Sequence, residues 1–202
     1  MTVHPLRLAV LTRNLEPGRF GTTVTEWFER QADRHDEFKP DLIDLSAVPL
    51  ADLPARVDEA DAVVIVTAEY NHAYPGDLKT AIDAVRRPWY AKPVAFVVYG
   101  GRSRGLRAAE QLRLVFGELH AVPIRDTLAF HESDFTPAGE PLDPTTPAGE
   151  PLDPAGSARD RRTAIGEPVD PTTPAAATAL LDQLAWWSRP LREARATTPY
   201  PA

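Results

Sequence analysis

The chain of 202 residues contains no cysteine. This absence excludes disulfide bonds, thiolate metal ligands and cysteine nucleophiles, and it suits a cytoplasmic protein. Positive charge is also scarce, because 22 Lys and Arg face 29 Asp and Glu, for a formal net charge of -7. Nucleic-acid binding requires clustered positive charge, so we expect no nucleic-acid partner. A small anionic ligand is still compatible with this composition, because a local basic pocket can bind it.

Long apolar runs are missing as well. The longest are the length of a strand, and residues 1–7 contain no apolar stretch of the kind found in a signal peptide. A membrane-spanning helix needs about 20 consecutive apolar residues. We therefore expect neither a signal peptide nor a membrane span, and a cytoplasmic location.

Short apolar runs alternate with helical patterns along residues 1–135. Strands are predicted at 6–11, 38–45, 60–67, 93–99 and 121–130, and helices at 24–31, 75–85 and 105–119. The third run, ADAVVIVT, is mostly Val, Ile and Ala, which is typical of a parallel strand buried on both faces. Alternating strands and helices imply right-handed βαβ units. The predicted core is therefore a doubly wound α/β domain with five parallel strands and helices on both faces.

Residues 136–174 have a different composition. The sequence PAGEPLDP occurs at Pro137 and again at Pro147, and a decayed copy begins at Ile165. Proline at this density excludes a helix or a central strand. We interpret the segment as a mobile surface insert made by tandem duplication, with a docking arm for a partner subunit as the alternative. Residues 175–202 return to helical spacing and predict a helix that packs on the core or on a partner chain.

Ligands of an open parallel sheet bind beyond the carboxyl ends of its strands, so the loops after the first, third and fourth strands are the candidate site. The first loop leads into a helix N-terminus, where free N–H groups attract a phosphate. The candidate ligand-binding residues of this loop are Arg13, Asn14, Arg19, Phe20 and Gly21.

The other two loops combine aromatic side chains with glycines. Glu69, Tyr70, Asn71 and Tyr74 follow the third strand, where two aromatics and an amide suit a flat heteroaromatic ring. Tyr99, Gly100, Gly101, Arg102 and Ser103 follow the fourth, where glycines let main-chain donors approach a ligand. His72 is the one candidate for a catalytic role, as a hydrogen-bond or proton donor, with a surface histidine as the alternative. No metal site is predicted.

These motifs, at their spacing, resemble the NADPH-dependent FMN reductase family. The resemblance rests on Glu69-Tyr70-Asn71, Tyr74-Pro75, Lys92-Pro93-Val94 and Tyr99-Gly100-Gly101, and it covers about residues 7–135 and 175–200. It implies a flavodoxin-like fold, noncovalent FMN, NAD(P)H as electron donor, and a homodimer or tetramer. It also implies that the FMN phosphate lies in the first loop and the isoalloxazine between the other two. Hydride would pass through the flavin to a flavin, a quinone or another small acceptor.

Three residues depart from the family pattern. Glu16 stands where the family has a phosphate-binding arginine, Ala68 replaces the proline before Glu-Tyr-Asn, and Arg104 replaces a glycine. A glutamate beside a phosphate repels it by on the order of 1 kcal/mol. The departures keep a second hypothesis open, in which a diverged flavodoxin-fold protein has lost FMN and serves a pathway-specific reaction or a ligand-binding role.

Overall fold

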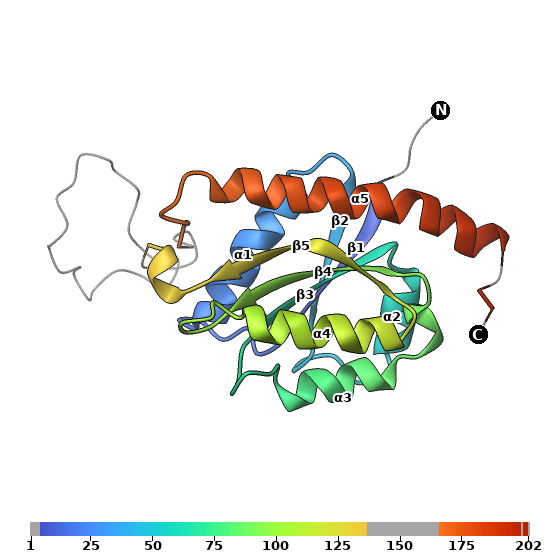
Figure 1. The fold of residues 1–202 in the computed structure, drawn as a ribbon, viewed down its shortest axis with the longest axis horizontal. Coiled ribbons are helices and arrows are strands. Elements are labelled where there is room, and N and C mark those ends of the chain that lie inside the picture. The colour runs from blue at the N-terminus through green and yellow to red at the C-terminus, as the bar shows by residue number, and fades with distance from the viewer. Residues whose placement is uncertain (1–4, 137–165, 199, 202) are drawn as a thin grey trace, which may run out of the picture.

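Five parallel strands form a single sheet in the order β2-β1-β3-β4-β5. The computed structural model describes residues 5–136, 166–198 and 200–201. Its strands are β1 (Leu6–Thr12), β2 (Phe38–Asp44), β3 (Ala62–Ala68), β4 (Pro93–Tyr99) and β5 (Val122–Phe130). Helices lie on both faces of the sheet (Figure 1). This strand order is that of flavodoxin-like folds, so the predicted fold class is confirmed.

Within the described residues, five α-helices connect or follow the strands. They are α1 (Phe20–Asp33), α2 (Leu53–Glu59), α3 (Gly76–Ala84), α4 (Leu106–Glu118) and α5 (Thr173–Thr197). The sequence patterns did not predict α2. It has only 7 residues, of which Leu53 and Val57 are buried, so it is too short to repeat an apolar spacing.

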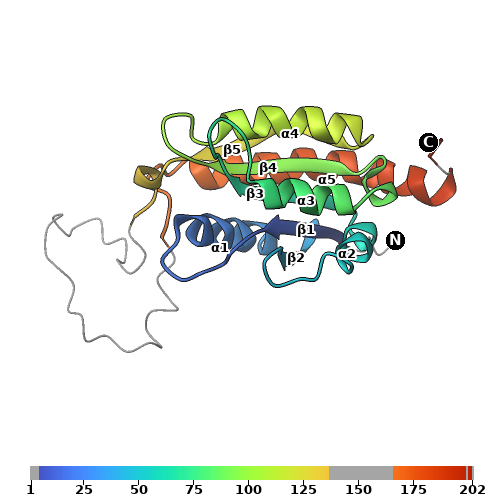
Figure 2. The same cartoon turned by 90° about the horizontal axis from the view of Figure 1, so that it is seen from below.

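The sheet separates two apolar layers. On one face the core contains Trp27 and Phe28 of α1 and Leu184 of α5, and on the other it contains residues of α2, α3 and α4. Figure 2 shows these layers from a second direction. Successive residues of β3 face opposite layers, because side chains alternate along a strand. Val64 therefore packs with α1 and α5, and Val63 packs with the other helices.

Helix α5 follows a segment that returns to the end of the sheet. Residues 137–165 of the proline-rich segment, on which the prediction of mobility falls, lie outside the described residues. Residues 166–172 run beside 134–136, where the Thr136 amide donates to the Glu167 carbonyl at 2.9 Å and the Val169 amide donates to the Asp134 carbonyl at 2.8 Å. Helix α5 begins at Thr173 and packs on β4, β5 and α1. Within the described ranges, no helix has the length and apolar character that a membrane crossing requires.

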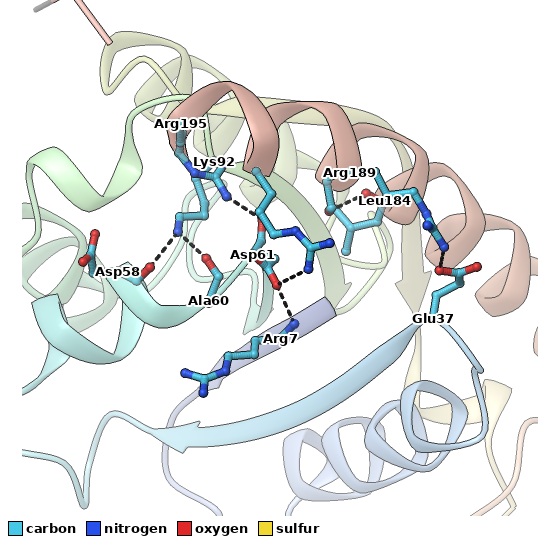
Figure 3. Close-up of polar contacts among 11 residues, drawn as sticks. Arg7, Glu37, Asp58, Ala60, Asp61, Lys92, Leu184, Arg189 and Arg195 are labelled. Atoms are coloured by element: carbon cyan, nitrogen blue, oxygen red, sulfur yellow. Dashed lines mark hydrogen bonds and ion pairs between the residues drawn. The ribbon is translucent and has the colours of Figure 1, made fainter. Parts of the chain in front are cut away.

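A buried lysine lies at the amino end of β4 (Figure 3). Only 2% of the Lys92 surface is exposed. Its Nζ donates to the main-chain carbonyls of Asp58 and Ala60, which end α2. A cation there is favourable because the carbonyls at a helix C-terminus carry partial negative charge. Burial, assisted by the nearby charge of Arg195, lowers the pKa of Lys92 to about 8.

Arginines of α5 fasten the helix to the same end of the sheet. Arg195 donates to the Ala91 carbonyl at 2.6 Å, and Arg192 pairs at 3.5 Å with Asp61, whose side chain also accepts from the Arg7 amide of β1. Figure 3 also shows Arg189 of α5 paired with a glutamate that precedes β2. The long helix is therefore tied to residues that lie just before β2, β3 and β4.

The pKa of Lys92 gives the stability of the fold a distinctive pH dependence. A lysine in the unfolded chain titrates at about 10.4, whereas the folded value is lowered to about 8. Between these values the unfolded chain binds more protons, so the free energy of unfolding should rise from pH 8 to pH 10. Urea unfolding across this range should show a smaller rise in Lys92→Met. The control Lys39→Met, at an exposed lysine of β2, should keep the rise, and equal slopes in all three proteins would contradict the assignment.

Candidate functional site

A cavity opens at the carboxyl edge of the sheet, where the loops after β1, β3 and β4 meet. Its lining residues are Arg13, Asn14, Arg19, Phe20, Gly21, Ala68, Tyr70, Pro75 and Tyr99. Strand β1 pairs with β2 on one side and with β3 on the other. Chain connections therefore reverse direction between β1 and β3, which is where flavodoxin-like sheets bind ligands. The structure brings together all five candidates of the first loop and one tyrosine from each of the other loops.

The first loop is held in place by Asp44 at the end of β2. Its carboxylate accepts hydrogen bonds from the Asn14 amide at 2.9 Å and the Leu15 amide at 3.1 Å, and from the amide and hydroxyl of Ser46. Burial alone would raise the pKa of Asp44, but these hydrogen bonds outweigh it and hold the pKa below its usual value. The loop is thus fixed by a charge that is not part of the cavity lining.

The first turn of α1 lines one end of the cavity and brings hydrogen-bond donors to it. Arg19 is the N-cap of the helix, and its side chain makes no capping hydrogen bond, so the amides of Phe20 and Gly21 begin the helix without a side-chain acceptor. The buried Nε of Arg13 also has no hydrogen-bond partner within the described residues. Uncapped amides, a helix dipole and an arginine are the donors that a phosphate group requires.

Two tyrosines form the aromatic end of the cavity. The side chain of Tyr70 is 53% exposed, and Tyr99 packs edge-on against Phe20 with 5.6 Å between ring centroids. A Cβ at position 21 would collide with the Tyr99 hydroxyl, so any residue larger than glycine displaces this tyrosine. Burial, with the neighbouring Tyr70, raises the pKa of Tyr99 to about 12. The Tyr99 hydroxyl therefore stays protonated at neutral pH and remains a hydrogen-bond donor.

The loop after β3 is a tight turn whose tip points away from the cavity lining. Tyr70 and Ala73 exchange backbone hydrogen bonds of 2.8 and 3.0 Å, and the two residues between them, Asn71 and His72, have φ values of 49° and 69°. Two left-handed central residues define a type I′ turn. Gln111 of α4 donates to the His72 carbonyl at 2.7 Å. Both tip side chains are exposed and neither lines the cavity, so their functional roles stay predictions.

Glu69 joins the loop after β3 to the loop after β4. Its carboxylate, with only 7% of the side chain exposed, accepts from the Ser103 hydroxyl at 2.6 Å. It also accepts from the Arg107 amide at 3.1 Å and guanidinium at 3.3 Å. Burial alone would raise the pKa of Glu69, but these hydrogen bonds lower it below its ordinary value. The carboxylate and the Ser103 hydroxyl thus contact one another and do not line the cavity.

The remaining predicted residues lie outside the cavity lining. Tyr74 packs against the core on the α3 side of the sheet, and the loop residues Gly100, Gly101 and Arg102 follow Tyr99 without lining the cavity. No ion pair to Arg102 is formed within residues 5–136 and 166–198. A direct contact of these residues with a ligand stays a prediction.

The three departures from the family pattern have local explanations. Glu16 lies 2.6 Å from Arg19 in an ion pair. Ala68 lines the cavity beside Tyr70. Arg104 has a φ of 55°, a conformation that favours glycine, and its guanidinium turns to pair with Asp134.

Sequence patterns missed three residues that shape the site. Asp44, Asp77 and Arg107 each act on a loop distant in the chain. One signal was available: Asp77 directly follows Pro75-Gly76, and acidic residues are common in the first turn of a helix. No sequence signal was available for Asp44 and Arg107, because their partners, Asn14 and Glu69, come close only in the folded arrangement of the loops.

The fold is that of a flavodoxin-like α/β protein, and the cavity at the carboxyl edge of its sheet is lined by aromatic rings, two arginines and the start of α1. Residues 6–134 match the NADPH-dependent FMN reductase family, and the chain belongs to this family. It is 29% identical over 134 residues to an NAD(P)H-dependent FMN reductase of Schizosaccharomyces pombe, covering 56% of this chain and 66% of that protein. It is 32% identical over 137 residues to a quinone reductase of Escherichia coli, covering 58% and 72%.

Solved structures agree on the fold. The flavoenzyme FerB, an NAD(P)H:(acceptor) oxidoreductase from Paracoccus denitrificans, aligns with a TM-score of 0.64 and 19% identity over 92% of this chain and 98% of that one. Three sequence relatives, including the S. pombe protein, are matched over only 30% to 66% of their own lengths. The predicted membership of the NADPH-dependent FMN reductase family is confirmed. The relatives do not support the alternative in which FMN has been lost.

The Glu69 network predicts a measurable cost when its charge is removed. Glu69→Gln replaces one acceptor oxygen by an NH₂ group that meets the donors of Ser103 and Arg107, so the free energy of unfolding at pH 7 should fall by about 1–3 kcal/mol. The difference should shrink as the pH falls through the pKa of Glu69, because protonation removes the same charge from the parent protein. Urea unfolding at pH 7 and in acid measures both effects.

Glu110→Gln provides the matched control for this substitution. Glu110 pairs with Arg113 on the surface of α4, with 74% of its side chain exposed, and exposed ion pairs contribute little. A loss in Glu69→Gln no larger than in Glu110→Gln would show that the loops do not depend on the buried carboxylate.

Proposed function

We propose that this chain is an FMN-dependent NAD(P)H oxidoreductase that passes electrons to a quinone, a free flavin or another small acceptor. The observation that carries the proposal is the two-ended cavity, which combines uncapped helix amides and Arg13 with the rings of Tyr70 and Tyr99. Flavin mononucleotide has the same two parts, a phosphate and a flat heteroaromatic ring. The E. coli relative is named a quinone reductase, which supports a quinone as one acceptor.

The residues at the other end of the cavity suit the phosphate of FMN. Arg13 lines the cavity, and its guanidinium is in an ion pair with Asp77 but makes no hydrogen bond within the described chain, so its N–H donors are available to an anion. The amides at the start of α1 add donors and a positive dipole end. Arg13, Phe20 and Gly21 are therefore the residues that would hold the phosphate, with Arg19 at the rim of the cavity.

The aromatic end of the cavity suits the isoalloxazine ring of FMN, because Tyr70 can contact the ring and Tyr99 can donate a hydrogen bond to it. The exposed face of Tyr70 offers a surface for a flat ring. Tyr99 keeps its proton because its pKa is raised to about 12, so it donates and does not repel an electron-rich ring edge. When bound, FMN supplies the hydride chemistry, and the protein supplies binding and orientation. No side chain of the cavity is required to transfer a proton.

Several finer assignments belong to this proposal. Contacts of His72, Asn71 and Tyr74 with a substrate or the flavin edge stay predictions, because these residues do not line the cavity. Arg102 offers an exposed guanidinium to an anionic group of the electron donor. The homodimer or tetramer and the cytoplasmic location also stay predictions.

Absorption spectroscopy tests the proposal directly. The purified protein, mixed with FMN and passed through a desalting column, should retain the visible bands of bound flavin at about one flavin per chain. The loaded protein should then consume NADPH or NADH when 1,4-benzoquinone is added. A protein that stays colourless at FMN concentrations that saturate a weak site, and that consumes neither donor, would overturn the proposal.

Gly21→Ala should weaken FMN binding. The added methyl group collides with the Tyr99 hydroxyl, so the tyrosine must move into the aromatic end of the cavity. We expect the Kd for FMN to rise roughly tenfold, the cost of a modest steric rearrangement. Fluorescence titration of FMN measures the change. Gly117→Ala is the control, because a methyl group at that position of α4 meets nothing within 4 Å, and its Kd should equal that of the parent protein. Equal affinities in all three proteins would contradict the proposed position of FMN.

A further inference from the structure

Both arginines that line the cavity are held by carboxylates of the same chain. Arg19 pairs with Glu16 at 2.6 Å, and Arg13 pairs with Asp77. The two contacts differ in their surroundings. Arg19 and Glu16 have about half of their side chains exposed, at 54% and 56%, whereas Arg13 is 33% exposed with a buried Nε and Asp77 is 50% exposed. Water and salt screen a less exposed contact less, so we expect the Asp77 contact to have the larger effect on a ligand.

Asp77 approaches the cavity from a different element than Arg13. It lies in the first turn of α3, whereas Arg13 follows β1. The Oδ1 atom of Asp77 accepts from the Leu78 amide at 3.0 Å, and its Oδ2 atom lies against the Arg13 Nε. The Nε contact is an ion pair without the geometry of a hydrogen bond, because this nitrogen has no hydrogen-bond partner. Arg13 lines the cavity, so its guanidinium can still donate hydrogen bonds to a ligand there.

We propose that Asp77 is a specificity-determining residue that competes with the flavin phosphate for Arg13 and so sets how strongly FMN is preferred over riboflavin. The inference rests on the proposed function, because it requires the phosphate of FMN to lie beside Arg13. A phosphate that binds there must share or displace the carboxylate, and the carboxylate stays close enough to repel it. Riboflavin has no phosphate, so its binding does not involve this competition.

This competition makes the chain bind FMN less tightly than its donor set allows. The amides of α1 and Arg13 together favour a phosphate, while the Oδ2 atom of Asp77, which lies against the Arg13 Nε, lowers the affinity for it. A cofactor held in this way exchanges with free flavin more readily than one held by an unopposed arginine. Removing the carboxylate should therefore tighten FMN binding, which is the opposite of the usual effect of a substitution in a binding site.

The test compares two substitutions on the same helix. Asp77→Asn removes the charge and keeps an oxygen for the Leu78 amide, whereas Asp83→Asn removes an exposed charge that pairs with Lys79 at 2.6 Å. Both change the net charge by one unit. Fluorescence titration with FMN and with riboflavin gives four Kd values beside those of the parent protein. We expect Asp77→Asn to lower the Kd for FMN on the order of fivefold, with the Kd for riboflavin unchanged and both values unchanged in Asp83→Asn.

The outcomes separate the inference from the proposed function. If the parent protein binds FMN and Asp77→Asn does not bind it more tightly, the inference is wrong and the function stands. An equal gain in Asp83→Asn, or an equal gain for riboflavin, also overturns the inference, because the effect would then not act at the phosphate. If neither the parent protein nor Asp77→Asn binds FMN, the inference and the proposed function both fail. Thermal unfolding of each variant verifies that the substituted proteins are folded.

Discussion

The arrangement of the site depends on the carboxylate of Glu69. A buried carboxylate is costly unless it is hydrogen-bonded or paired, and here three donors from Ser103 and Arg107 supply what water would have supplied. Those donors lie in the loop after β4 and at the start of α4, so the charge is satisfied only when two loops and a helix are all in place. The contact therefore also helps to position Tyr70, which follows Glu69, and Tyr99, which ends β4 just before the second loop.

Asp44 has the same role on the other side of the cavity. Its carboxylate fixes the amides of Asn14 and Leu15, as Glu69 fixes the loops after β3 and β4. Parallel strands bring both carboxylates to one edge of the sheet, so the cavity lies between two independently fixed groups of loops. Neither carboxylate lines the cavity. The donors at the start of α1 are therefore held in position before any ligand arrives, which reduces the ordering cost of binding.

The sequence predicted the elements well where their signal was local. Strands β1, β3 and β4 are largely apolar runs, and β4 has the predicted bounds because Pro93 and the glycines after Tyr99 punctuate it. Helix α2 was missed because two buried residues do not make a periodicity. At the site, the Glu69-Tyr70-Asn71 motif indicated which residues follow β3, but it did not indicate which way their side chains point. Glu69 was predicted to contact the cofactor, yet its carboxylate turns to the neighbouring loop, and the part played by Asp77 depends on a crossing of β1 and α3 that no local pattern encodes.

The two charged departures from the family pattern are each paired with an opposite charge. Glu16 pairs with Arg19 and Arg104 with Asp134, so neither leaves an unopposed charge beside the cavity. The backbone of Arg104 also keeps the left-handed conformation that a glycine favours. The loops therefore accommodate both residues without a change in their course, and under the proposed function we expect these departures to affect the affinity for a phosphate-bearing flavin more than the identity of the ligand.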